Sequence, residues 1–148
     1  MSRRQLLRAI DTARLQQAIM DAERKTSGEV AVSVSPLFWG SVEKAAHRAF
    51  VRLGMSRTRE RNGVLIFVVP ARRRFMVLGD SGIHAKAGQD FWTKVASRLS
   101  EHFRAGEFTE GLVAAIDEIG GQLASHFPYD AATDRNELPN DIDFGKSG

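Results

Sequence analysis

The stretch RTRERNG-VLIFVVP-ARRR-FMVLGDSGIHAKAGQDFW (57–92) decides the fold of this chain. Its six apolar residues 64–69 form the continuous run that is typical of a strand buried on both faces. Pro70 and three arginines follow and predict a turn, and 75–78 form a second strand too close to the first for a helical crossover. The two strands must therefore pair as an antiparallel hairpin. The loop before the first strand and the GDSG turn (79–82) after the second then lie at the same end of the sheet.

The composition is that of one globular domain. The chain has 148 residues, of which 43% are hydrophobic and 26% are charged, and these are ordinary values. The absence of cysteine excludes disulfides and thiolate metal sites, and it suits a reducing compartment. The N-terminus lacks the apolar centre of a secretory signal, and no stretch approaches the ~18 apolar residues of a membrane span. We therefore expect a soluble, cytoplasmic protein with a single domain over 1–128 and an acidic C-terminal tail over 129–148.

The charges are unevenly distributed, although the formal net charge is only +3. The segment 48–74 contains eight arginines and one acidic residue, Glu60. The segment 127–148 contains five acidic residues against Arg135 and Lys146. The basic middle and the acidic tail either attract one another or form two separate solvated surfaces, and the sequence leaves both alternatives open.

Three elements are expected before the hairpin. Residues 11–25 form a helix with Asp11 as its N-cap, and the alternating segment EVAVSV (29–34) forms a strand. Ser41 caps a second helix over 42–53. Because this helix connects two strands as a βαβ crossover, the strands at 29–34 and 64–69 are parallel.

Two further helices are expected after the hairpin, over 89–104 and 109–125. The Gly120-Gly121 pair in the second helix indicates close packing of that helix on the sheet. The tail is expected to run as an extended strap, with a short fourth strand as an alternative. The fold class is therefore α/β, and the architecture is a three-layer α/β/α sandwich in which a short mixed β-sheet is flanked by about four helices.

Asp80 is the strongest candidate for a functional residue, because it follows a strand and precedes a helix start. It has two roles that can coexist, as a cap of the backbone N–H groups at 81–85 and as a metal ligand or nucleophile. Glu29, Glu60 and Asn62 open the two parallel strands and could join Asp80 around a hard cation such as calcium. Three arginines surround the same loop and oppose a cation there: Arg57, Arg59 and Arg61.

The same three arginines favour an anion site instead. Together with N–H groups of 81–84 they could bind phosphate, with His84 as general acid and Asp80 as nucleophile or base. The sequence contains no C-x5-R, D-x-D-x-T or P-loop motif that would support a phosphatase directly. His84 is equally compatible with a polar turn residue.

Other conspicuous residues have simpler interpretations. The three consecutive arginines 72–74 could contact nucleic acid or anionic lipid, but without interleaved aromatic residues a solvated hairpin tip is favoured. Trp39 is expected to pack against the neighbouring helix rather than over a cleft. His47, His102 and His126 show no metal-ligand spacing.

Four separated segments occur in the order that is familiar from one protein family. They are TRERNGVLIFV (58–68), GDSGIHAKAGQDFW (79–92), EHFRAGEFTEGLVAAI (101–116) and HFPYD…NELPNDI (126–142). Over about residues 12–142 the chain resembles the TPM-domain family, which includes thylakoid acid phosphatase-like proteins and bacterial proteins formerly described as a domain of unknown function. The resemblance is greatest to a small stand-alone cytoplasmic branch.

This resemblance implies an α/β/α sandwich, in agreement with the element order above. It also implies binding of calcium-like ions near an acidic cluster, and acid phosphatase activity is associated with plant members. Some bacterial relatives occur alongside LemA-type membrane proteins, which suggests a membrane-associated partner. The family pattern has Asp before Asn-Gly at the strand entry, whereas this chain has Arg61, and this departure removes a candidate anionic ligand.

The sequence thus favours a non-enzymatic TPM-type binding module with an ion or anion site at the 57–62/79–84 edge of the sheet. Its expected partner is an unidentified protein, LemA-like in the membrane-associated case, and the only cofactor it suggests is a divalent cation such as calcium. The alternative is a weak metal-dependent phosphomonoesterase at the same edge. Nucleic-acid binding by the basic middle is the least favoured function.

Overall fold

Strand β2 (Gly63–Val69) is the centre of a three-stranded mixed sheet with the order β1-β2-β3. In the computed structural model, which describes residues 8–37, 39–130 and 141–145, every residue of β2 is buried. β1 (Glu29–Val34) pairs with β2 in parallel, with Glu29 opposite Gly63. β3 (Arg74–Gly79) returns antiparallel, with Gly79 opposite Val64. The predicted buried strand, its parallel partner and the hairpin are all confirmed.

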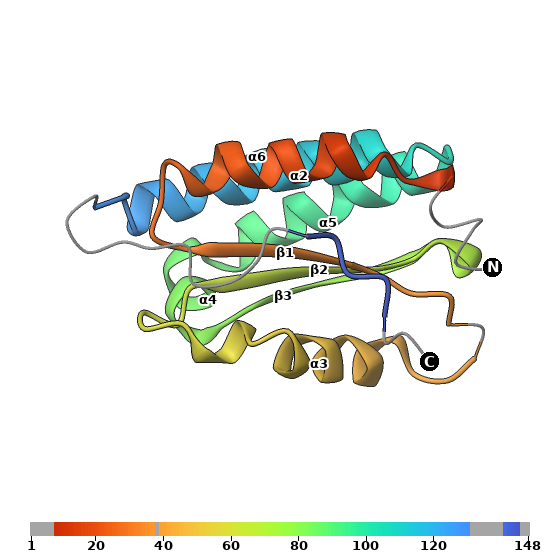
Figure 1. Cartoon of the computed structure of the whole chain (residues 1–148), viewed down its shortest axis with the longest axis horizontal. Coiled ribbons are helices and arrows are strands. Elements are labelled where there is room, and N and C mark those ends of the chain that lie inside the picture. Colours follow the sequence, from red (N-terminus) through yellow and green to blue (C-terminus); the bar gives the residue numbers. More distant parts are fainter. Residues whose placement is uncertain (1–7, 38, 131–140, 146–148) are drawn as a thin grey trace.

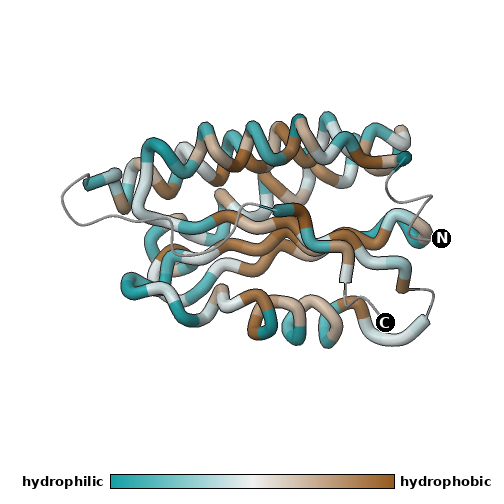
Figure 2. The backbone as a smooth tube through the Cα atoms, in the orientation of Figure 1, coloured by the Kyte–Doolittle hydropathy of each residue, from teal (hydrophilic) through white to brown (hydrophobic). Residues whose placement is uncertain are grey.

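Helices cover both faces of this sheet, as the predicted α/β/α sandwich requires (Figure 1). One face carries α2 (Thr12–Glu23), α5 (Gln89–Arg104) and α6 (Phe108–His126), and the other carries α3 (Val42–Arg52). Strand alternation divides the apolar side chains of β2 between the two cores. Val64, Ile66 and Val68 belong to the three-helix core, and Leu65, Phe67 and Val69 belong to the α3 core. Figure 2 shows the resulting apolar sheet between helices whose outer sides are hydrophilic.

The expected capping residues begin the helices where the sequence places them. The Asp11 carboxylate accepts a hydrogen bond from the Arg14 N–H at 3.2 Å, and the Ser41 hydroxyl accepts one from the Lys44 N–H at 3.1 Å. After Asp80 the sequence predicts only the start of a helix. The structure has a separate two-turn helix there, α4 (Ser81–Ala87). The described residues therefore contain five α-helices where about four were expected. None of the described helices is long and apolar enough to cross a membrane.

The hairpin tip is largely exposed, as expected, and its three arginines are also held by contacts within the chain. A short 3-10 helix, η2 (Pro70–Arg72), makes the turn, and each arginine has a partner within the chain. Arg72 donates to the carbonyl of Gly40, Arg73 donates to the carbonyl of Arg104, and Arg74 forms an ion pair with Glu43. The tip lies at the end of β2 and β3 opposite to Asp80, as the strand register requires.

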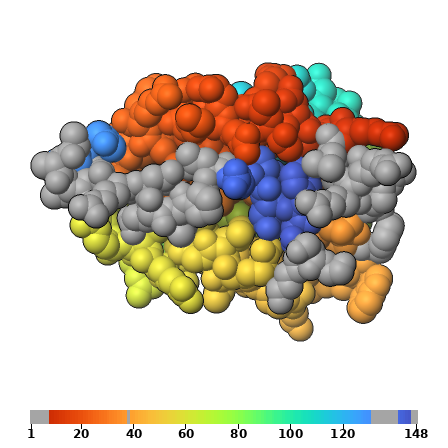
Figure 3. All heavy atoms as spheres, viewed as in Figure 1, coloured from red at the N-terminus to blue at the C-terminus, as the bar shows by residue number. Residues whose placement is uncertain are grey.

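The described part of the tail lies along the free edge of β1. Asp143 forms a single parallel bridge with Ser33, with hydrogen bonds from the Asp143 N–H to Val32 and from the Val34 N–H to Asp143. Ile142 is buried, and Figure 3 shows residues 141–145 between the α2 and α3 layers. The tail is thus an extended strap where it is described, and the fourth strand is reduced to one bridge. Asp143 also pairs with Arg52, so the acidic tail and the basic middle meet at this point.

Two expectations about packing are wrong. Trp39 is 82% exposed and does not pack against the neighbouring helix, because α3 already buries its small apolar face (Val42, Ala46 and Ala49) directly on the sheet. The Gly120-Gly121 pair does not serve helix-to-sheet packing. A Cβ at Gly120 would lie 2.7 Å from the Cβ of Ala22 in α2, so Gly120 allows two helices to approach, whereas Gly121 faces open space.

These two adjacent glycines give a matched test of the helix contact. Gly120→Ala should lower the free energy of unfolding by about 1–3 kcal/mol, because α2 and α6 must move apart. Gly121→Ala should raise it by about 0.4–1 kcal/mol, since alanine reduces the conformational freedom of the unfolded chain without meeting any atom. Urea unfolding of both variants measures the difference. Equal effects of the two substitutions would contradict the close approach of α2 and α6.

Candidate functional site

The loop that enters β2 is held by its own short turn. The Thr58 hydroxyl accepts a hydrogen bond from the Asn62 N–H at 3.1 Å, and the Thr58 carbonyl accepts one from the Arg61 N–H at 3.3 Å. Arg61 has a φ of 54°, in the left-handed region that few non-glycine residues adopt. This turn buries Asn62, which is 1% exposed, while the arginine side chains of the loop stay in solvent.

The turn after β3 docks directly on this loop. The Asp80 N–H donates to the carbonyl of Gly63 at 2.9 Å, and the Gly82 N–H donates to the carbonyl of Arg61 at 2.8 Å. A Cβ at Gly82 would lie 2.2 Å from the carbonyl oxygen of Glu60, so only glycine permits this approach. The segments 57–62 and 79–84 therefore lie side by side at the end of the sheet where β2 begins and β3 ends. We name this region the 57–62/79–84 edge.

Asp80 caps α4, and one of its oxygens has no hydrogen-bond donor. Oδ1 accepts from the Ser81 N–H at 2.7 Å. Oδ2 is buried and accepts no hydrogen bond among the residues that the structure describes, and the closest cation is Nη1 of Arg61 at 4.0 Å. The structural role expected for Asp80 is thus present, and half of its carboxylate remains available.

Asn62 presents a second oxygen of the same kind. Its Nδ2 donates to the Ser27 hydroxyl at 3.3 Å, and its backbone carbonyl accepts from the Glu29 N–H. Its Oδ1 is buried, and no described residue donates to it. A buried acceptor without a donor costs about 1–3 kcal/mol. A water or a cation can complete the contacts of such an atom.

Glu29 is buried and forms a carboxyl pair with Glu23, which the sequence did not predict. It is 3% exposed and hydrogen-bonded to Glu23, which lies in the last turn of α2 and accepts from the Val30 N–H at 3.0 Å. Burial, followed by the hydrogen bond to Glu29 and its charge, raises the pKa of Glu23 to about 9. At neutral pH the Glu23–Glu29 pair therefore holds one proton, which the two carboxyl groups share through their hydrogen bond.

The arginines that were expected to bind an anion lie on the surface beside this edge. Arg57, Arg59 and Arg61 are all exposed, and so is Glu60. The backbone N–H groups of 81–84 already donate within the chain. Those of Gly82 and Ile83 donate to the Arg61 carbonyl. The Ser81 N–H donates to the Asp80 side chain, and the His84 N–H donates to the Asp80 carbonyl. An anion at this edge would therefore meet arginine side chains rather than the start of α4.

The His84 ring contacts Trp92 and is not hydrogen-bonded to Asp80 as an acid–base pair would require. Its exposed ring stacks on Trp92 with an interplanar angle of 11° and a centroid distance of 5.9 Å. Within the described residues no hydrogen bond connects this ring to Asp80. Asp80 caps the start of α4 and His84 lies in its last turn, and no hydrogen bond joins the two side chains as an acid–base pair.

The edge offers few acidic groups for a metal. The described segments contain no group of three or more His, Cys, Asp or Glu residues that could hold a metal ion. Asn62 Oδ1 and Asp80 Oδ2 are buried oxygens of this edge without a described donor, and both are of the kinds that bind hard cations. Glu60 is in solvent and Glu29 is paired with Glu23, so the four expected ligands share one edge but do not form one cluster.

Comparison with known proteins assigns the chain to a family. The model of the TPM domain matches residues 2–122. The chain belongs to the TPM domain family. No curated protein matches this TPM domain.

Solved structures that resemble this TPM domain include two NMR structures. The NMR structure of the BA42 protein from the psychrophilic bacterium Bizionia argentinensis is 35% identical, with a TM-score of 0.83 over 92% of this chain and 95% of that chain. The solution NMR structure of the N-terminal domain of a P. gingivalis protein is 21% identical, with a TM-score of 0.64 over 82% of each chain. The second match shows a shared fold only.

The Glu23–Glu29 pair predicts a pH dependence of stability. Between the ordinary glutamate pKa of 4.5 and about 9, the unfolded chain loses the Glu23 proton while the folded chain keeps it. The free energy of unfolding should therefore fall across this interval as the pH rises. In Glu23→Gln the amide can donate to Glu29 and accept from Val30 at every pH, so the slope should be smaller.

Urea unfolding at pH 5, 7 and 9 measures this slope. Glu110→Gln is the control, because the pKa of Glu110 is lowered, chiefly by its hydrogen bond from Arg14, and Glu110 does not titrate in this interval. A Glu23→Gln protein with the same pH slope as the unchanged chain would contradict the shared proton.

Proposed function

We propose that this TPM domain is a non-enzymatic binding module whose functional centre is the 57–62/79–84 edge, and that a hard divalent cation such as calcium binds there. The observation that carries the proposal is the pair of buried acceptors without donors, Asn62 Oδ1 and Asp80 Oδ2. Amide and carboxylate oxygens are the ligands that calcium prefers, and water can supply the rest of its six to eight contacts.

Charge sets the strength expected of this site. Asp80 provides one carboxylate, and the guanidinium of Arg61 lies 4.0 Å from it. The Arg61 side chain is 61% exposed, so it can turn into solvent when a cation approaches. One carboxylate and a neighbouring positive charge favour binding in the millimolar range, which is typical of sites with few charged ligands.

The proposal includes a protein partner in the cytoplasm, and the family resemblance suggests a membrane-associated, LemA-like one. A cation at the sheet edge would fix the two loops and their arginines in one arrangement for the partner.

A weak metal-dependent phosphomonoesterase is the alternative. It is favoured by the presence of Asp80 and His84 on the same short helix, α4, next to a loop with three exposed arginines. The separation of His84 from Asp80 by stacking on Trp92 favours the binding module instead.

Arg61 provides the sharpest test of the cation site. Arg61→Asp removes a positive charge beside Asp80 and supplies the carboxylate of the family pattern, and Asp adopts a positive φ more readily than Arg. Calcium affinity should rise by about tenfold or more. Arg57→Asp is the matched control, since it changes the charge of the same loop by the same amount away from Asp80.

Amide NMR shifts during a calcium titration measure both affinities. In the unchanged chain the shifts should be confined to 58–63 and 79–83, and Asp80→Asn, which can still cap Ser81, should abolish them. No shift at 20 mM calcium in either the unchanged chain or Arg61→Asp would refute the site. If the chain hydrolyses p-nitrophenyl phosphate and Asp80→Asn abolishes this activity, the phosphomonoesterase replaces the binding module as the proposed function.

A further inference from the structure

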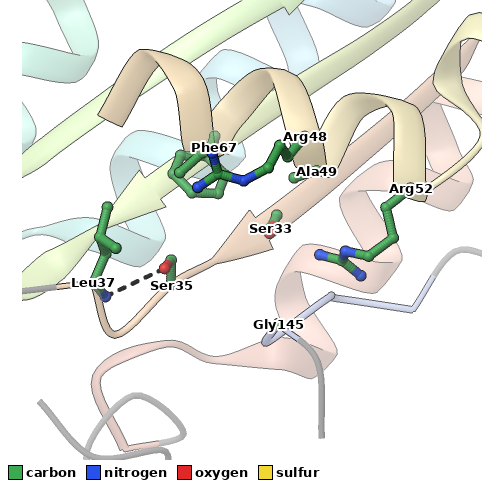
Figure 4. A pocket seen from close by; sticks show the side chains of 9 residues that line it. Ser33, Ser35, Leu37, Arg48, Ala49, Arg52, Phe67 and Gly145 are labelled. Atoms are coloured by element: carbon green, nitrogen blue, oxygen red, sulfur yellow. Dashed lines mark hydrogen bonds between the residues drawn. The ribbon is translucent and has the colours of Figure 1, made fainter. Parts of the chain in front are cut away.

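A cavity of about 390 Å³ lies at the opposite end of β1 from Asn62 and Asp80 (Figure 4). It is bounded by the end of β1, by α3 and by the tail, and its lining combines cationic, hydroxyl and apolar groups. The cationic and hydroxyl side chains are those of Arg48, Arg52, Ser33 and Ser35. Its volume is within the range of about 300–1,000 Å³ that is typical of small-molecule sites.

The cavity follows from the side chains that β1 presents to α3. On this face β2 contributes Leu65 and Phe67, which fill the space below the helix, whereas β1 contributes only Ala31 and Ser33. α3 packs over β2 and β3, so the small side chains of the edge strand leave the space above them open. The hollow is therefore encoded in the EVAVSV strand.

The arginine and serine side chains around this cavity can donate hydrogen bonds to an anion. Arg48 and Arg52 are one turn apart on α3, and Figure 4 shows both side chains beside the cavity. No described carboxylate forms an ion pair with Arg48. The Ser35 oxygen accepts from the Leu37 N–H at 3.2 Å, which leaves its hydroxyl hydrogen to donate. The opposite walls are apolar and include Phe67 and Leu37.

Two of the side chains that line this cavity already bind a carboxylate of the chain, that of Asp143. Arg52 holds Asp143 with both terminal nitrogens, at 3.1 and 2.7 Å, and the Ser33 hydroxyl donates to the same group at 2.7 Å. Burial alone would raise the pKa of Asp143, but the hydrogen bonds from Arg52 and Ser33 hold it below its usual value. This part of the lining is thus built to bind a carboxylate, and the second arginine beside it has no described counterpart.

We propose that the cavity is a binding site for a small organic carboxylate, held by Arg48 and Ser35 with its apolar body against Phe67 and Leu37. The Arg52 guanidinium already binds Asp143, so the Arg48 guanidinium is the one available to the ligand. If Asp143 were released, the ligand could also bind the Arg52 guanidinium. The planar guanidinium matches the two oxygens of a carboxylate, and the apolar walls select an organic body over an inorganic ion.

Benzoate is a suitable probe, because it joins a carboxylate to a small apolar ring. Titration at low salt should produce saturable amide shifts at 33–37, 45–52 and 67, relative to chloride at equal ionic strength. Arg48→Gln should raise the Kd by about tenfold or more, since a charge-assisted hydrogen bond is lost. Arg24→Gln, which removes another exposed arginine, at the C-cap of α2, should leave the Kd unchanged.

Asp143→Asn tests the role of the tail. It removes the competing charge from Arg52, so benzoate should bind more tightly than to the unchanged chain, while the resonances of 142–145 report whether the tail has moved. A linear, unsaturated response, or equal losses in Arg48→Gln and Arg24→Gln, would overturn the site. Weaker binding by a folded Asp143→Asn protein would overturn the competition with Asp143.

Discussion

The burial of β2 on both faces is the constraint on which the rest of this structure depends. Seven consecutive buried residues require a partner strand on each side and a helical layer above and below. The short hairpin then forces the end of β3 back beside the start of β2, where the Asp80 N–H meets the Gly63 carbonyl. The candidate site is therefore a consequence of strand order, and the docking of Gly82 on the Arg61 carbonyl secures it.

Local signals in the sequence were sufficient for most of the fold. The apolar run of β2, the caps Asp11 and Ser41, and the length of the hairpin each act over a few residues, so their outcome does not depend on distant partners. Asp80 was identified as a cap and a candidate ligand for the same local reason. The segment of α4 was expected only as a polar turn and a helix start, although Gly88 divides it from α5.

What could not be predicted depends on contacts between distant segments. The proton shared by Glu23 and Glu29 requires the end of α2 to face the start of β1, and no spacing in the sequence indicates this. The pair of Arg52 and Asp143 spans 91 positions. A composition argument could suggest that basic and acidic segments attract each other, but it could not select these two residues. The burial of Asn62 likewise depends on a turn that Thr58 closes.

The two ends of this short sheet have opposite hydrogen-bonding demands. At the Asn62–Asp80 end, buried oxygens lack donors, and the nearby N–H groups of α4 are already used. At the other end of β1, Arg48 and the hydroxyl of Ser35 are donors in excess of the described acceptors, even after Asp143 has engaged Arg52 and Ser33. A cation would balance the first end and an anion the second. Because separate loops and helices form these ends, one ligand cannot serve both, and binding at each can be examined without disturbing the other.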